Sequence, residues 1–329
     1  MTGTAPAPLP DRLEELPNLA LDRSSHTSFE EGHCAMELVA YLAGEDHTDR
    51  PTCTSPVLTR FLIALNDALP DDARQKIKPH LPKVIGTRDD QDEARGWIAT
   101  DWSIRVALPT WLELAGTNEA ATVLRALDPI TADNFAEVRP KVLEIRREAR
   151  NRRDKAMAEL RKRVDEEVTK ALKGKKLPAA AAAAVAEAVA EAVAEAVAEA
   201  VAEAAAVAVA VAVAEAAAAA VAVAVAVAAA VAEAEAVAAA VAVAVAVAEA
   251  AAVAVAVAEA VAVAEAVAAA RGDLKVGSDS WWEFRTKVRE ATRKAIQPVL
   301  DEKIQPTSES LLGSALELLD KMIDPKAAE

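Results

Sequence analysis

The sequence predicts an all-α protein, on three observations. Between Ser24 and Ile130, apolar residues recur at helical spacing and no stretch alternates as a half-buried strand does. The charged segment from Lys141 to Leu177 repeats apolar residues three, four or seven positions apart, which is typical of a coiled-coil seam. Residues 179–270 consist of 56 alanines, 25 valines and 11 glutamates, and alanine is the strongest helix former.

These compositional changes divide the chain into five segments. In order, they are a disordered, proline-rich lead (1–23), an all-α globular domain (24–130), a basic coiled-coil-like helix (131–177), an Ala/Val/Glu repeat tract (178–270) and a pair of C-terminal amphipathic helices (271–329).

Capping signals place the helices of the globular domain. Ser28 with Glu31 forms a capping box, which predicts a helix that begins there and ends at Gly44. Ser55 as N-cap and Pro56 in the first turn predict a second helix through Leu69. Further helices are expected over 71–78, over 89–114 with an interruption at Pro109, and over 117–127.

Several short motifs of this domain carry a family resemblance. They are Glu30-Glu31-Gly32-His33-Cys34-Ala35-Met36-Glu37, Asp49-Arg50-Pro51-Thr52-Cys53, Asn66-Asp67-Ala68-Leu69-Pro70-Asp71-Asp72 and Trp102-Ser103-Ile104-Arg105. In these residues the chain resembles a family of all-helical actinomycete and actinophage proteins that has no assigned activity. The resemblance covers residues 24–116, about a third of the chain, and implies a domain but no site residue.

Pro140 is expected to open the basic helix. Between Arg139 and Lys176 there are fifteen basic and seven acidic residues. Five arginines crowd two turns and could contact phosphates of a nucleic acid: Arg146, Arg147, Arg150, Arg152 and Arg153. The competing interpretation is a solvated coiled-coil face, neutralised by neighbouring acidic residues, and we favour it.

The repeat tract carries two conflicting signals: its two-residue period is typical of a strand, whereas its composition favours a helix. Every even position from Ala180 onward is alanine, so helix is favoured over strand, although the uncharged segments 206–214 and 220–228 fit stacking strands. As a helix, the odd positions spread valine around the circumference and predict no packing stripe. Glutamates four residues apart, beginning with Glu187 and Glu191, are expected to repel one another slightly. The tract therefore predicts a spacer.

The C-terminal segment predicts two helices. Ser280 and Glu283 form a capping box for the first, Pro306 is expected to break it, and 310–323 is expected to form the second. The adjacent Trp281 and Trp282 cannot both enter one apolar stripe, so one of them is a candidate anchor for a protein partner.

Charge and composition exclude some classes of protein and favour others. The net charge is −15, but the tract alone carries eleven glutamates, so the acidity argues against the whole chain wrapping a nucleic acid. Residues 1–17 hold four prolines and no apolar core, so a secretory signal is not predicted and a cytoplasmic location is. The alanine-rich tract is too weakly hydrophobic for a membrane span.

Residues that could bind a metal ion gather only near Cys34, His47 and Cys53. One hypothesis is a metal site there, and the alternative is that the cysteines are reduced and structural. No catalytic or phosphate-binding motif occurs, and neither a cofactor nor a small-molecule substrate is predicted. We expect a non-enzymatic structural or protein-interaction protein that binds a partner or itself through its helices. The alternatives are an accessory protein of phage or plasmid type that binds nucleic acid through the basic helix, and a metal-binding or enzymatic N-terminal domain.

Overall fold

The computed structural model describes residues 6–173, 183, 185–193, 195 and 278–327. All regular structure within these residues is helical, which confirms the predicted all-α class. The elements are α1 (Pro10–Glu15), η1 (Leu16–Asn18), α2 (Ala35–Ala43), α3 (Pro56–Ala68), α4 (Asp71–Arg74), η2 (Gln75–His80), α5 (Leu81–Val84), α6 (Asp92–Trp102), η3 (Ser103–Ala107), α7 (Leu108–Leu114), α8 (Asn118–Arg125), α9 (Phe135–Leu172), α13 (Asp279–Ile323) and η4 (Pro325–Ala327). Among the described helices, none has the length and apolar character needed to cross a membrane.

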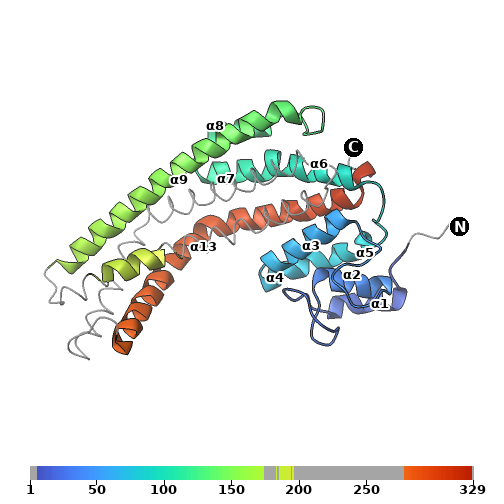
Figure 1. The fold of residues 1–329 in the computed structure, drawn as a ribbon, viewed down its shortest axis with the longest axis horizontal. Coiled ribbons are helices and arrows are strands. Elements are labelled where there is room, and N and C mark those ends of the chain that lie inside the picture. Colours follow the sequence, from blue (N-terminus) through green and yellow to red (C-terminus); the bar gives the residue numbers. More distant parts are fainter. Residues whose placement is uncertain (1–5, 174–182, 184, 194, 196–277, 328–329) are drawn as a thin grey trace.

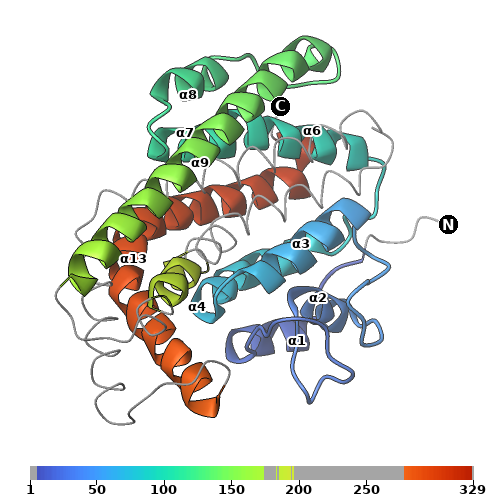
Figure 2. The same ribbon diagram turned by 60° about the vertical axis from the view of Figure 1, so that its left-hand side comes forward.

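Short helices form a base from which two long helices extend. Helix α9 has 38 residues and α13 has 45, whereas the longest helix of the base, α3, has 13. In both ribbon views the far ends of α9 and α13 lie on the same side, away from α1 to α5 (Figures 1 and 2). The chain leaves the base through α9 and returns to it through α13.

The start of α2 differs from the prediction. The helix begins at Ala35, and Cys34, not Ser28, is its N-cap. Gly32 stands just before it with φ +140°, a conformation that a helix excludes and that glycine accepts. The Ser28 and Glu31 capping box is wrong because the Glu31 carboxylate accepts hydrogen bonds from Thr27 instead. By contrast, Ser55 caps α3 as predicted, since its hydroxyl accepts from the amides of Val57 and Leu58.

Proline interrupts the helices less than expected. Pro109 lies in the first turn of α7, directly after the π-helical turn η3, so the chain stays helical from Asp92 to Leu114. A π turn widens the helix where the proline ring would otherwise meet the carbonyl four residues earlier. Pro140 does not open α9, which begins five residues earlier, at Phe135.

Helix α13 is one continuous helix, so the predicted C-terminal pair is wrong. Pro298 and Pro306 both lie inside it, and the ribbon bends along its length (Figure 1). Each internal proline costs about 3 kcal/mol. Apolar side chains on both sides of the prolines are buried, including Val288, Ile304 and Leu311, and burying each such side chain yields about 1.5–3 kcal/mol. Packing against the rest of the protein therefore offsets the cost of the two prolines, and the helix continues through them.

The C-terminal end of α13 is bound to the base by polar contacts around a buried arginine. Arg95 of α6 is fully buried and its Nε donates to the carbonyl of Met322 at 2.8 Å. Its Nη atoms bind the carboxylates of Asp89 and Asp92. Elsewhere along this contact, the Trp102 indole donates to Ser314 Oγ at 2.6 Å. We call this contact the clamp.

A second polar contact of the clamp lies nearer the surface. Asp320 of α13 accepts hydrogen bonds from Lys83 Nζ at 2.9 Å and contacts His80 Nδ1 at 3.0 Å. Burial raises the pKa of Asp320, but the hydrogen bonds from Lys83 and His80 outweigh it, so that the pKa lies below its ordinary value. The globular base is thus completed by residues from the far end of the sequence.

Replacing Arg95 with alanine tests the clamp. The substitution removes the donor of the Met322 carbonyl and leaves the Asp89 carboxylate without its guanidinium, so we expect a loss of roughly 3 kcal/mol in the free energy of unfolding, measured in urea. The matched control is Arg125→Ala, which breaks the exposed ion pair with Glu113 and should cost at most about 1 kcal/mol. Equal effects of the two substitutions would contradict the clamp.

Candidate interaction surface

The beginning of the repeat tract packs as an amphipathic helix. Residues 185–193 are helical. The buried side chains among them follow the i, i+3, i+4, i+7, i+8 pattern of one helix face: Val185, Ala188, Val189, Ala192 and Val193. For these residues the helical prediction is confirmed, but the expectation that no packing stripe forms is wrong. The strand alternative for 206–214 and 220–228 lies outside the described residues.

The stripe comes from a four-residue repeat inside the two-residue one. From Glu187 to Ala202 the sequence repeats Glu-Ala-Val-Ala without exception. Four residues are close to one helical turn of 3.6 residues, so each valine lies nearly above the previous one and each glutamate does the same. The drift is about 40° per repeat, and over a few turns the valines and glutamates therefore form two separate stripes.

The glutamate stripe is paired with arginines of α13. The Arg285 guanidinium lies 2.7 Å from a carboxylate oxygen of Glu191 and 3.6 Å from one of Glu187. Arg289 pairs in the same way with Glu195, and the hydrogen bond lowers the pKa of that carboxyl. We call these contacts the ladder. The repulsion expected between the glutamates is thus countered by cations from another helix.

The ladder fixes the direction of the two helices. Arg285 with Glu191 and Arg289 with Glu195 are both separated by 94 positions, so the two helices run parallel and in register. Beside the ladder lies an open hollow of about 190 Å³, lined by Ala192, Glu195, Thr286, Arg289, Glu290 and Arg293. Five of the six lining residues carry polar or charged side chains, which suits a surface for another protein better than a pocket for an apolar molecule.

Trp282 lies next to the ladder and is 57% exposed. The guanidinium carbon of Arg285 is 5.6 Å from the centre of its indole ring, within the range of a cation–π contact. Tryptophan and arginine are both enriched among the residues that contribute most to the affinity of protein interfaces. The side chain of the other candidate anchor, Trp281, lies outside the described part of the chain.

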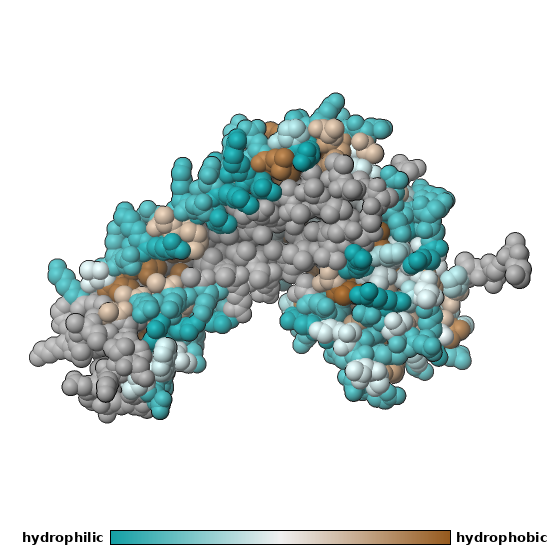
Figure 3. Space-filling model, in the orientation of Figure 1, coloured by the Kyte–Doolittle hydropathy of each residue, from teal (hydrophilic) through white to brown (hydrophobic). Residues whose placement is uncertain are grey.

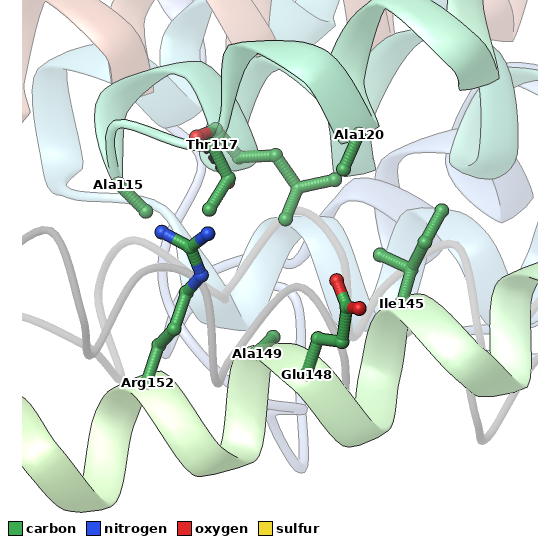
Figure 4. A pocket seen from close by; sticks show the side chains of 8 residues that line it. Ala115, Thr117, Ala120, Ile145, Glu148, Ala149 and Arg152 are labelled. Carbon is green, nitrogen blue, oxygen red and sulfur yellow. Dashed lines mark hydrogen bonds between the residues drawn. The ribbon is translucent and has the colours of Figure 1, made fainter.

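The five arginines of α9 do not form one free surface. Arg147 and Arg153 pair with Glu144 and Asp154, at 3.4 Å and 2.8 Å. The side chain of Arg152 points toward Ala115 and Thr117 at the turn between α7 and α8 (Figure 4). Arg146 and Arg150 are half-buried.

Two further features of α9 concern its surface and its seam. The surface over α9 is mostly hydrophilic in Figure 3, and acidic side chains are interspersed among the more numerous basic ones. The pocket drawn in Figure 4 has only about 10 Å³ of space for a water-sized molecule, too little for any ligand larger than water. The predicted apolar seam is buried, with Val142, Leu160, Val164 and Val168 each at most 3% exposed.

A polar cluster in the base surrounds the carboxylate of Glu37. This side chain is 1% exposed and accepts hydrogen bonds from the amides of His26 and Cys34, at 2.7 Å and 2.8 Å. His26 Nδ1 lies 2.9 Å away and His47 Nε2 lies 3.6 Å away. Burial raises the pKa of Glu37, but these hydrogen bonds together lower it below the ordinary value. Gly32 lies so close to the cluster that a Cβ there would be only 2.8 Å from His26 Nε2, so a larger residue would clash.

The structure does not bring the proposed metal ligands into one set. Cys34 caps α2, and His47 contacts the carbonyl of His26 and the carboxylate of Glu37. The Cys53 amide binds Glu45. Within the described ranges, no group of three His, Cys, Asp or Glu side chains could hold a metal ion. Burial raises the pKa of the Cys34 thiol to about 12 and that of Cys53 to about 11, so both stay protonated at neutral pH.

Comparisons with protein families, curated proteins and solved structures found no match for this chain. The family resemblance of residues 24–116 therefore stays a prediction, and the candidate surface is argued from its own geometry.

Glu37→Gln tests the polar cluster. The variant keeps the shape but loses the charge that four contacts stabilise, so we expect a loss of about 1–3 kcal/mol in the free energy of unfolding at neutral pH. Because the folded-state pKa of Glu37 is depressed, its contribution is present above the ordinary carboxyl range and is lost as the pH falls through the folded-state value.

The difference in stability between the two proteins should therefore begin to shrink as the pH falls below the ordinary carboxyl range of about 4 and disappear below the folded-state pKa of Glu37. The control is the exposed Glu119→Gln, which should follow the wild type at every pH. A Glu37→Gln difference that stays constant down to acid pH would contradict the charge-based account.

A salt titration with random duplex DNA tests the arginine cluster. Since these side chains are paired, half-buried or directed toward the turn between α7 and α8, we expect no binding at low salt. A nucleic-acid-binding helix would instead show an affinity that falls steeply as salt rises. The matched variant is Arg147→Ala with Arg152→Ala, which should lower such an affinity if α9 binds DNA and change nothing if it does not.

Proposed function

We propose that the protein is a non-enzymatic interaction protein, in which a helical base carries two long helical arms that bind protein partners. The observation that carries the proposal is the clamp. Because Arg95 holds the C-terminal end of α13 against α6, the chain from Phe135 to Ile323 leaves one base and returns to it. A base that anchors both ends presents the intervening helices at a fixed place, which is what a scaffold requires.

The surface of the arms supports a protein partner. Trp282, Arg285 and Arg289 lie together at the beginning of α13, beside the hollow next to the ladder. Tryptophan and arginine contribute most to the affinity of protein interfaces. The charged lining of the hollow gives such an interface a polar rim.

The cysteines of the base support a structural role. A thiol acts as a nucleophile or metal ligand only as a thiolate, and burial raises the pKa of Cys34 and of Cys53 far above neutrality. Cys34 instead caps α2, and its amide binds Glu37. The Glu37 carboxylate, which accepts from the amides of His26 and Cys34, holds the loop from Asp22 to Cys34 against α2.

Trp282→Ala tests the proposal. The full chain should associate as its concentration rises in sedimentation velocity, and the substitution should weaken that association about tenfold or more, since interface tryptophans contribute about 2 kcal/mol or more. Val123→Ala is the matched control, because Val123 is 46% exposed on α8, in the base. A wild type that stays monomeric throughout, or two variants that behave alike, would overturn the role of this surface.

A further inference from the structure

The ladder joins two helices that are parallel although they belong to one chain. Parallel neighbours require the chain to travel back along its own length between them, and 94 positions separate each pair. Both segments of the ladder are present in every copy of the chain, so two copies offer each other the same complementary charges.

The contact combines an apolar stripe with ion pairs. On one side, residues 185–193 contribute a stripe of valine and alanine. On the other, α13 contributes the buried Val288 and Thr292 between its arginines. Arg289 and Glu195 are 39% and 55% exposed, and an ion pair of such exposure contributes roughly 0–1 kcal/mol, whereas Arg285 is only 14% exposed. Such a contact can dissociate without unfolding the clamp, which lies at the opposite end of α13.

The register of the ladder depends on a repeat, not on a unique residue. Arg285 contacts both Glu187 and Glu191, the equivalent glutamates of two consecutive Glu-Ala-Val-Ala units. The beginning of α13 thus recognises a helix with glutamate at every fourth position and valine beside it. Every copy of this chain carries the same repeat from Glu187 to Ala202.

We propose that the beginning of α13 binds the Glu-Ala-Val-Ala helix of a second copy of this chain, which produces a dimer by reciprocal exchange of the two helices. Each copy gives one repeat helix and receives another, so the dimer contains two identical ladders related by a twofold axis. No contact is made in the dimer that the single chain does not already contain. The inference rests on the proposed interaction function and names its partner.

Charge reversal in two separate variants provides the test. One variant carries Arg285→Glu and Arg289→Glu, and the other carries Glu191→Arg and Glu195→Arg. In either variant alone, the ladder is repulsive both within a chain and between identical chains. In a mixture, the α13 helix of each variant is complementary to the repeat helix of the other. Light scattering at high protein concentration should therefore give each variant as a monomer and the equimolar mixture as a dimer.

Two controls show whether the ladder causes the association. A chain with all four substitutions restores complementary charges within itself and should behave as the wild type does. The pair Arg125→Glu and Glu113→Arg reverses an ion pair inside the base and leaves the ladder unchanged, so each variant and their mixture should associate as the wild type does. Raising the salt concentration should weaken the dimer of the first mixture, because exposed charges are screened.

A cysteine trap provides an independent measurement. Ala192 and Thr286 line the same hollow from the two helices of the ladder. Mixing an Ala192→Cys chain with a Thr286→Cys chain under mild oxidation should yield a covalent dimer on a non-reducing gel, whereas Val123→Cys should not replace either partner. A mixture that stays monomeric in both assays overturns the exchange. The Trp282→Ala measurement on the otherwise unchanged chain then still decides the broader interaction function, because association through an exposed tryptophan needs no exchange of the repeat helices.

Discussion

The buried guanidinium of Arg95 is the constraint on which the rest of the arrangement depends. A fully buried charge is tolerated only where carboxylates and carbonyls compensate it, and Arg95 obtains these from two directions. Asp89 and Asp92 come from its own part of the chain, whereas the carbonyl of Met322 comes from the last turn of α13. A cation there also faces the negative end of the helix dipole. The base is therefore complete only when the C-terminal end of the chain is in place, which couples the folding of the two ends.

Local signals in the sequence predicted the class and most helices, but failed where distant residues decide. Ser55 caps α3 as expected because a hydroxyl acts within its own turn. The proline at 306 was expected to end a helix, and nothing within ten residues of it shows otherwise. The apolar residues on either side, Ile304 and Leu311, stay in one helix because the rest of the protein covers both. For α2, the deciding feature was the positive φ of Gly32, which reflects the close approach of His26 and Asp22.

At the candidate surface, too, residues far apart in the sequence decide what local signals do not predict. In an isolated helix, glutamates four residues apart repel one another, so the expected repulsion is correct for a helix without partners. The cations that reverse the effect lie 94 positions away. A signal was nevertheless present, because Arg285, Arg289 and Arg293 repeat with the same spacing of four as Glu187, Glu191 and Glu195. Matching periods of opposite charge in two helical segments indicate a parallel or antiparallel pair, and the structure adds the direction. The arginines of α9 match no such series, and the structure disperses them.

The clamp and the ladder lie at opposite ends of α13 and differ in strength for a physical reason. At the clamp, the Arg95 guanidinium is buried away from water, and removing one of its partners would leave a buried charge uncompensated. This end of α13 therefore separates from α6 only when the base unfolds. At the ladder, the carboxylates of Glu191 and Glu195 are 42% and 55% exposed although Arg285 is only 14% exposed, so water can replace the lost partner of a carboxylate at less cost than at the clamp. One helix therefore carries a fixed end and a releasable end. The releasable end binds a helix with a repeated charge pattern and can exchange one such helix for another. The fixed end keeps the arm in place meanwhile. This difference between its two ends distinguishes an interaction arm from a long helix that is fixed throughout.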